Sequence, residues 1–84
     1  MTRIEIYGKQ NCASCTKAKM YCESRDWDFS YLELDRDFTR EDVLEKFPGA
    51  RTFPQIRIHG QHVGGFEDFM KYIDDTGFTN SGHG

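Results

Sequence analysis

Apolar and polar residues follow a short-period pattern in three parts of the chain. Arg3 to Tyr7 (RIEIY) alternates and ends at a glycine, and Phe29 to Leu34 (FSYLEL) is rich in aromatic residues between charged turns. Gln55 to His59 (QIRIH) alternates again and leads through Gly60-Gln61 into His62 to Gly64. Such segments are typical of strands, and a Gly-X connection predicts a type II′ hairpin. We therefore expect four strands, the last two of them antiparallel neighbours.

Apolar residues three, four and seven positions apart predict two longer helices. The first covers Ala13 to about Arg25, with Cys15, Ala18 and Cys22 along one stripe. The second starts near Phe66 and should end at Gly77, a residue that commonly terminates helices. Its apolar stripe consists of Phe66, Phe69, Met70 and Ile73.

A third, shorter helix is predicted from its ends. The Thr39 hydroxyl can cap the N–H of Asp42, while Phe38 and Val43 fit a hydrophobic staple. Pro48-Gly49 should stop this helix. The order βαβαββα then combines a parallel βαβ pair with an antiparallel hairpin. We expect an α/β fold, with one small four-stranded mixed sheet and three helices.

The length of 84 residues allows one folding unit, which we place at residues 1–77, with a loose tail at 78–84. The net charge of −3 comes from interspersed acids and bases, which argues against nucleic-acid binding. No apolar run approaches the roughly 20 residues that span a bilayer, and MTRIEIYG lacks the apolar centre of a signal peptide. We expect a cytoplasmic protein without membrane contact, and a monomer, because no heptad pattern is present.

The chemistry of the chain centres on CASC, in which Cys12 and Cys15 are three residues apart. Cys12 precedes the first helix, where free N–H groups and the helix dipole favour a thiolate; CxxC thiols so placed have pKa values of roughly 3.5 to 7.5. Lys9 adds positive charge nearby. Cys15 lies one turn into the helix and should be more buried. This asymmetry predicts an outer attacking thiol and an inner resolving thiol for thiol–disulfide exchange.

Other uses of the cysteines fit the sequence less well. Zinc would need two further ligands, and the chain has neither a second CxxC nor an HxxxH pair. A structural bridge across so short a loop would remove little chain entropy. Cys22 lies about 10 Å along the helix from Cys15, whereas bridged cysteines have Cα atoms about 4.4 to 6.8 Å apart. Cys22 is therefore predicted to be a small buried core residue.

Three motifs in this order resemble the glutaredoxins, small members of the thioredoxin-fold superfamily: CASC, RTFPQI and GGFED. The resemblance covers roughly Ile4 to Ile73. It implies a thioredoxin-like fold in which the proline of Thr52-Phe53-Pro54 is cis and faces the active cysteine. It also implies an oxidoreductase that uses glutathione to reduce protein disulfides and glutathione mixed disulfides through Cys12 and Cys15. Ribonucleotide reductase is a common client of this family.

The resemblance further implies a groove for glutathione, the electron donor. Lys9 matches the basic residue that meets the glycine carboxylate, with Arg51 as a second candidate. Phe53 matches the position whose backbone pairs with the glutathione cysteine. The turn that would hold the γ-glutamyl end consists of Gly65, Phe66, Glu67 and Asp68. From charge alone, Asp68 could equally complement the helix dipole, and Lys9 and Arg51 could be solvated surface charges.

The sequence departs from the family at Ala13-Ser14, where many dithiol glutaredoxins have Pro-Tyr. The change alters the helix start and removes one wall of the groove. Members that lack this proline sometimes hold an iron–sulfur cluster between two subunits. Three functions therefore stay open: a glutathione-dependent dithiol oxidoreductase without a metal, a thioredoxin-like electron donor recharged by a flavoprotein reductase, and a glutathione-ligated iron–sulfur cluster carrier.

Overall fold

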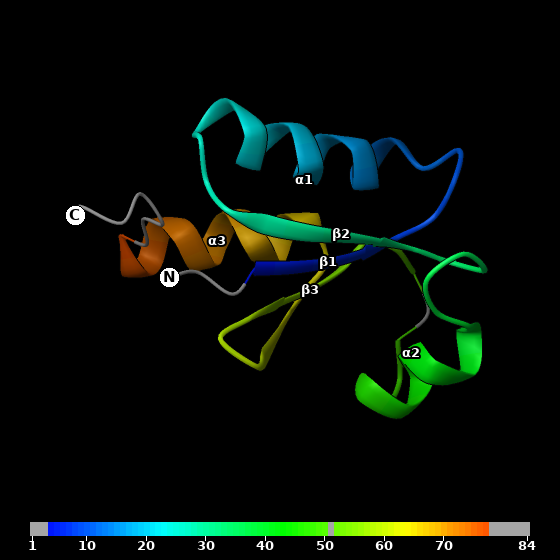
Figure 1. The fold of residues 1–84 in the computed structure, drawn as a ribbon. Coiled ribbons are helices and arrows are strands. Elements are labelled where there is room, and N and C mark those ends of the chain that lie inside the picture. The colour runs from blue at the N-terminus through cyan, green and yellow to red at the C-terminus, as the bar shows by residue number, and fades with distance from the viewer. Residues whose placement is uncertain (1–3, 51, 78–84) are drawn as a thin grey trace.

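A four-stranded sheet forms the centre of the computed structural model, which describes residues 4–50 and 52–77 (Figure 1). In spatial order the strands are β2, β1, β3 and β4. β1 pairs in parallel with β2 and antiparallel with β3, and β3 pairs antiparallel with β4. The predicted mixed sheet is thus confirmed. The strands comprise Ile4–Gly8 (β1), Phe29–Glu33 (β2), Gln55–Ile58 (β3) and Gln61–Gly64 (β4).

The turn between β3 and β4 differs from the predicted one by a residue. Ile58 pairs with Gln61, so the two connecting residues are His59 and Gly60 instead of Gly60 and Gln61. Both have positive φ angles, +53° and +81°. Positive φ at both central positions is the signature of a type I′ turn, whose twist matches that of the flanking strands. The predicted type II′ turn is therefore wrong, because His59 adopts the left-handed conformation and Gln61 belongs to the strand.

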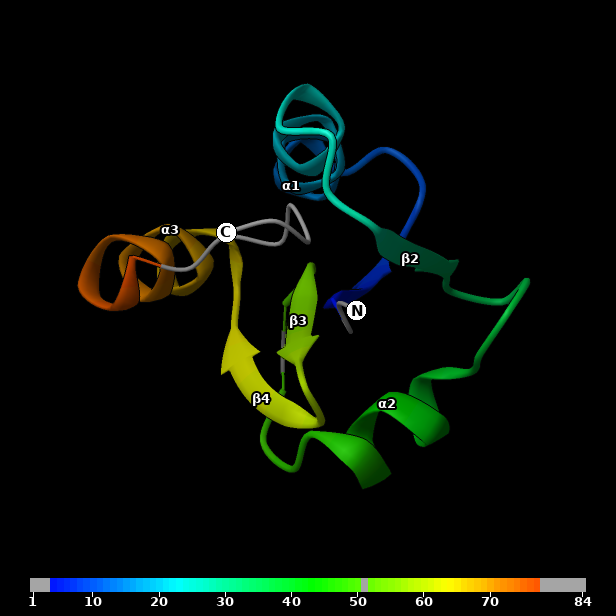
Figure 2. The same ribbon diagram turned by 60° about the vertical axis from the view of Figure 1, so that its left-hand side comes forward.

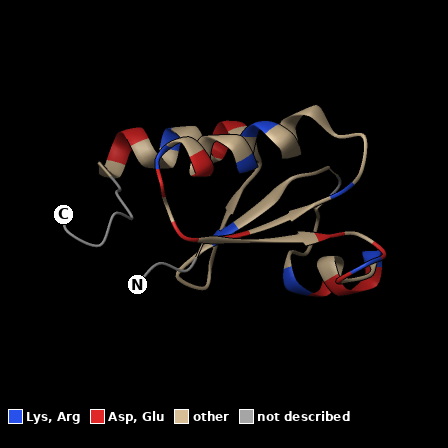
Figure 3. Cartoon of the chain, turned by 45° about the horizontal axis from the view of Figure 1, so that its top comes forward, with Lys and Arg blue, Asp and Glu red and all other residues tan. Residues whose placement is uncertain are grey.

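The three helices cover both faces of the sheet. α1 (Ala13–Ser24) and α3 (Phe66–Thr76) lie on one face, and α2 (Arg40–Lys46) lies near the other (Figures 1 and 2). Gly77 ends α3 with a left-handed φ of +63°, as predicted. None of the helices within the described residues is long and apolar enough to cross a membrane. Basic and acidic residues are interspersed along the helices (Figure 3).

The larger core lies between the sheet and the pair α1 and α3. Alternation along β1 and β3 points one set of side chains toward this side, and the apolar stripes of the two helices meet them. Phe69 is fully buried, and Phe66, Met70 and Ile73 pack against the cluster. The predicted stripe of α3 is therefore its core face. The buried members are Ile4, Ile6, Ala18, Cys22, Trp27, Ile56, Ile58 and Phe69.

A second, smaller core lies on the α2 side of the sheet. Its buried members are Tyr7, Phe38, Val43 and Phe47. Phe38 and Phe47 pack edge to face on the Tyr7 ring, with centroids 5.1 and 5.3 Å away. Phe38 and Val43 share this cluster, as the predicted staple requires. The short helix α2 is therefore held mainly by a few aromatic contacts.

A complete capping box starts α2. The Asp42 N–H donates to the Thr39 hydroxyl (3.1 Å), and the Thr39 N–H donates to the Asp42 carboxylate (2.9 Å). Two N–H groups that would otherwise lack partners are thereby satisfied. The predicted cap is confirmed. The predicted tail, residues 78–84, lies outside the described residues, and so does Arg51.

We expect Thr39→Ala to lower the free energy of unfolding by about 1 kcal/mol, the usual cost of losing an N-cap side chain. Urea unfolding followed by circular dichroism measures this change. Thr39→Ser keeps the hydroxyl and is the matched control, which should stay close to the unmodified protein. Equal stability of the alanine and serine variants would contradict a stabilising role for the cap.

Candidate active site

Cys12 and Cys15 lie where the chain leaves the sheet and enters α1. Cys12 is the N-cap residue, with extended backbone angles (φ −126°, ψ 106°), and its sulfur accepts a hydrogen bond from the Cys15 N–H (3.2 Å). Asn11, directly before it, has a left-handed φ of +56°. The two cysteines form a disulfide, with Cα atoms 5.3 Å apart. The helix start thus presents a backbone N–H directly to the Cys12 sulfur.

The electrostatic surroundings of Cys12 favour its thiolate form. The first turn of α1 contains no acidic residue that would neutralise the positive end of the helix dipole. Lys9 lies three residues upstream and is exposed. In the reduced protein, the N–H of Cys15 can donate to the Cys12 thiolate, and such donation lowers a thiol pKa. Cys12 therefore meets the requirements of a nucleophile.

The three cysteines, one capping α1 and two within it, differ sharply in exposure. Cys12 is half-buried, whereas Cys15 and Cys22 have no exposed surface. Cys22 is a free thiol in the larger core. Burial, with a smaller contribution from Glu23, raises the pKa of Cys22 to about 12. The prediction of a buried core cysteine at position 22 is confirmed.

The loop before β3 faces Cys12. The Phe53-Pro54 peptide bond is cis, as the resemblance implied, and Pro54 is buried. The carbonyl oxygen of Phe53 lies 3.7 Å from the Cys12 sulfur. The Lys9 ammonium lies 6.0 Å from the centroid of the Phe53 ring, so Lys9 borders the same region. Segments about 40 residues apart in the sequence thereby converge on one sulfur.

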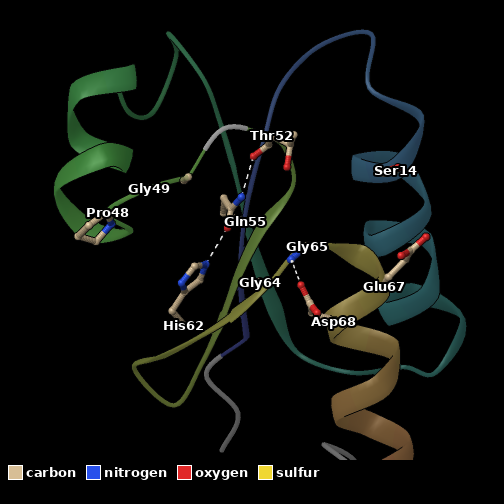
Figure 4. A pocket seen from close by; sticks show the side chains of 11 residues that line it. Ser14, Pro48, Gly49, Thr52, Gln55, His62, Gly64, Gly65, Glu67 and Asp68 are labelled. Atoms are coloured by element: carbon tan, nitrogen blue, oxygen red, sulfur yellow. Dashed lines mark hydrogen bonds between the residues drawn. The ribbon is translucent and has the colours of Figure 1, made fainter.

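A groove with a volume of about 500 Å³ is lined by residues next to these in the sequence, among them Ser14 and Thr52, but not by Lys9, Cys12, Phe53 or Pro54 themselves (Figure 4). Of the predicted glutathione-binding residues, it brings together Thr52, Gly65, Glu67 and Asp68. Ser14, the second residue between the cysteines, lines it as well. Its remaining walls come from the loop after α2 and the last two strands: Pro48, Gly49, Ala50, Gln55, His62 and Gly64.

The start of α3 closes one side of the groove. The N-cap is Gly65, which has no side chain to satisfy the first helical N–H groups, while the Asp68 carboxylate accepts from the Gly65 N–H (3.3 Å). Gly64 has a φ of +126°, and a side chain there would collide with Asp68. Phe66 packs its side chain against the larger core, so only its backbone can serve the groove. The first N–H groups of a helix lack partners within the helix, and they suit a carboxylate ligand.

A pair of hydrogen bonds made by a buried side chain beside the groove was not expected from the sequence. The buried Gln55 side chain donates from its amide nitrogen to the Thr52 carbonyl (2.8 Å), and its amide oxygen accepts from the His62 ring (2.7 Å). His62 also stacks on Phe47, with centroids 4.3 Å apart. These hydrogen bonds hold the loop that carries Phe53. A polar residue at an inward position of a strand was the available signal, because a buried amide needs partners.

The described residues, 4–50 and 52–77, contain no group of three or more His, Cys, Asp or Glu side chains placed to hold a metal ion.

Comparisons with known proteins agree with this geometry. The sequence model of the glutaredoxin family matches residues 4–63. Glutaredoxin 3 of Escherichia coli (strain K12) is 37% identical over 68 residues, covering 81% of this chain and 82% of that protein. The structure of reduced E. coli glutaredoxin superimposes with a TM-score of 0.76 at 28% identity, covering 88% and 95% of the two chains.

A complex of buckwheat glutaredoxin with glutathione has a similar fold, with a TM-score of 0.75 at 24% identity over 88% of this chain and 70% of that one. The three helices and four-stranded mixed sheet are thus those of the thioredoxin-like glutaredoxin structures. The predicted fold class is confirmed.

We expect an alkylating agent to distinguish the three thiols of the reduced, folded protein. Iodoacetamide at neutral pH should label Cys12 first, because it combines exposure with thiolate stabilisation. Cys22 should stay unlabelled up to pH 9, since its raised pKa keeps it a thiol, and should react only after unfolding in urea. Peptide mass spectrometry reads out each site. Labelling of Cys22 as fast as Cys12 in the folded protein would contradict this assignment.

Proposed function

Because this chain belongs to the glutaredoxin family, we propose that it reduces protein disulfides and glutathione mixed disulfides through Cys12 and Cys15, with glutathione as electron donor. The family and fold make the chain a thiol–disulfide oxidoreductase. The observation that carries the finer proposal is the position of the Cys12 sulfur, which accepts from the α1 start and lies 3.7 Å from the Phe53 carbonyl.

In the first step, the Cys12 thiolate attacks one sulfur of a substrate disulfide. A Cys12–substrate disulfide forms, and the other substrate sulfur leaves as a thiolate and takes up a proton. Cys15 then loses its proton and attacks the Cys12 sulfur. This attack releases the reduced substrate and leaves the Cys12–Cys15 disulfide found in the structure. The half-buried position of Cys12 and the buried position of Cys15 support this order.

Two molecules of glutathione complete the cycle. The first glutathione thiolate attacks Cys12, which forms a mixed disulfide and frees Cys15. The second attacks the glutathione sulfur of that mixed disulfide, which frees Cys12 and produces oxidised glutathione. The substrate thus gains two electrons, and two glutathione molecules each supply one.

The charges around the groove support glutathione as the donor. Its glycine carboxylate would meet Lys9, and its cysteine would pair with the Phe53 backbone. Its γ-glutamyl carboxylate would receive N–H groups at the start of α3, and its ammonium would face Asp68. The buckwheat glutaredoxin of similar fold was crystallised with glutathione. Ser14 lines the groove in place of a bulky aromatic residue, so the CASC site would be a more open version of the dithiol type.

The proposal predicts different losses for the two cysteines. Cys12→Ser should abolish all turnover, because it removes the nucleophile. Cys15→Ser should block the reduction of protein disulfides but keep much of the removal of glutathione from mixed disulfides, which needs Cys12 alone. Rates with a small glutathione mixed disulfide and with a disulfide-bearing protein measure both activities; oxidised ribonucleotide reductase is a suitable protein substrate. Equal inactivity of both variants toward the mixed disulfide would contradict the assigned roles.

The electron source is tested in the same assay. NADPH consumption is followed with glutathione plus glutathione reductase, and separately with thioredoxin reductase alone. Activity only in the glutathione system is expected. Activity only with thioredoxin reductase would overturn glutathione dependence and favour the thioredoxin-like alternative. A visible absorption band after anaerobic purification would favour the iron–sulfur alternative.

We expect Asp68→Asn to raise the KM for a glutathione mixed disulfide about two- to fivefold while kcat changes little, because an exposed charge pair contributes up to about 1 kcal/mol to binding. Asp75→Asn, which neutralises an exposed acid at the far end of α3, is the matched control and should leave the KM unchanged. A loss of stability in Asp68→Asn with no change in KM would assign Asp68 to helix capping alone.

A further inference from the structure

Tyr31 lies on β2 beside the resolving cysteine. β2 pairs with β1, and α1 passes over this part of the sheet (Figure 1). The Tyr31 hydroxyl oxygen and the Cβ of Cys15 both lie within 3.1 Å of the point that a side chain on Gly8 would occupy. Glycine at position 8 therefore leaves room for the hydroxyl to approach Cys15. Part of the Tyr31 ring packs against the larger core.

Within residues 4–50 and 52–77, the Tyr31 hydroxyl makes no hydrogen bond. The Lys19 ammonium, one turn beyond Cys15 on α1, lies over the Tyr31 ring, 5.2 Å from its centroid. Burial, and then the charge of Glu33, raise the pKa of Tyr31, while Arg36 acts weakly in the opposite direction. The hydroxyl thus keeps its proton at neutral pH and can act as a donor.

Cys15 needs such a donor at one moment of the cycle. It has no exposed surface, so water cannot solvate its sulfur freely when it becomes a thiolate. The backbone N–H of Cys15 donates to the Cys12 sulfur, so it does not stabilise the Cys15 sulfur. An unpaired buried thiolate would be costly, and a hydrogen bond to the charged form lowers that cost.

We propose that Tyr31 is a positioning residue that donates a hydrogen bond from its hydroxyl to the Cys15 thiolate. The proposal rests on the proposed function, in which Cys15 resolves the mixed disulfide. In that step the Cys15 proton passes to solvent, the Cys15–Cys12 bond forms and the Cys12–substrate bond breaks. In the reverse direction Cys15 leaves as a thiolate, and the same hydrogen bond stabilises the leaving group. The hydroxyl proton stays on Tyr31 throughout.

The test follows the resolving step directly. Reduced protein is mixed with oxidised glutathione, quenched with acid at increasing times, and analysed by mass spectrometry for the Cys12–glutathione mixed disulfide. Tyr31→Phe should slow the decay of this species about tenfold at neutral pH, the size expected for one hydrogen bond to a charged group. The pH of half-maximal decay should rise by about one unit, because the Cys15 thiolate loses its donor.

Two controls separate a specific role from a structural one. Tyr21→Phe removes the hydroxyl of another partly buried tyrosine that packs on the same core, on Trp27 and Phe69, and it should leave the decay unchanged. Tyr31→Phe in the Cys15→Ser background should remove glutathione from a small mixed disulfide as fast as Cys15→Ser alone, because that reaction does not use Cys15.

Each outcome has a distinct meaning. Slow decay with a raised pH midpoint in Tyr31→Phe alone supports the inference. Decay equal to that of Tyr21→Phe overturns it, as does an equal loss in the Cys15-independent reaction, which would assign Tyr31 a packing role. If the unmodified protein forms the mixed disulfide but Cys15 does not resolve it, the proposed function fails, and this result is distinguishable because it needs no Tyr31 variant.

Discussion

The antiparallel pairing of β1 with β3 is the constraint on which the active site depends. Tyr7 lies opposite Gln55, so the last part of β1 and the first part of β3 lie side by side at one end of the sheet. The first carries Cys12 and the second carries Phe53, which explains why residues so distant in sequence are in contact. A slip of one residue would turn the buried side chains of Ile56 and Ile58 to the opposite face. The hydrophobic register of the sheet therefore also sets the geometry of the cysteine site.

Local patterns in the sequence were enough to predict the helices and strands. The features that these patterns could not predict depend on pairing between residues far apart in the chain. The N-terminal cap of α2 and the C-terminal glycine of α3 were predictable because each involves residues within one turn of helix. The β3–β4 turn was misplaced by one residue, since alternation does not say which residues pair across a hairpin. The partners of Gln55 and the approach of Tyr31 to Cys15 depend on neighbours far away in the chain. The resemblance implied residues for the groove, but it could not have implied these supporting contacts.

One helix gives its three cysteines three different chemical characters. Cys12 caps the helix, where an N–H group and the dipole favour negative charge. Cys15, one turn later, is enclosed but still reaches the Cys12 sulfur. Cys22, two turns further on, lies among aliphatic and aromatic side chains, and its raised pKa makes it behave as a small hydrophobic residue. Position along α1 thus decides which thiols can exchange disulfides.

The small residues between the cysteines affect how a ligand would be held. With Ala13 and Ser14 at the helix start, neither side chain forms a large wall, and the groove is bordered chiefly by the loop after α2, the last two strands and the start of α3. Contacts to backbone groups depend little on the side chains of an extended peptide. The charged ends of glutathione would add only about 1 kcal/mol each at such exposed positions. On the proposed function, a groove built this way favours glutathione modestly and still admits the disulfides of other proteins.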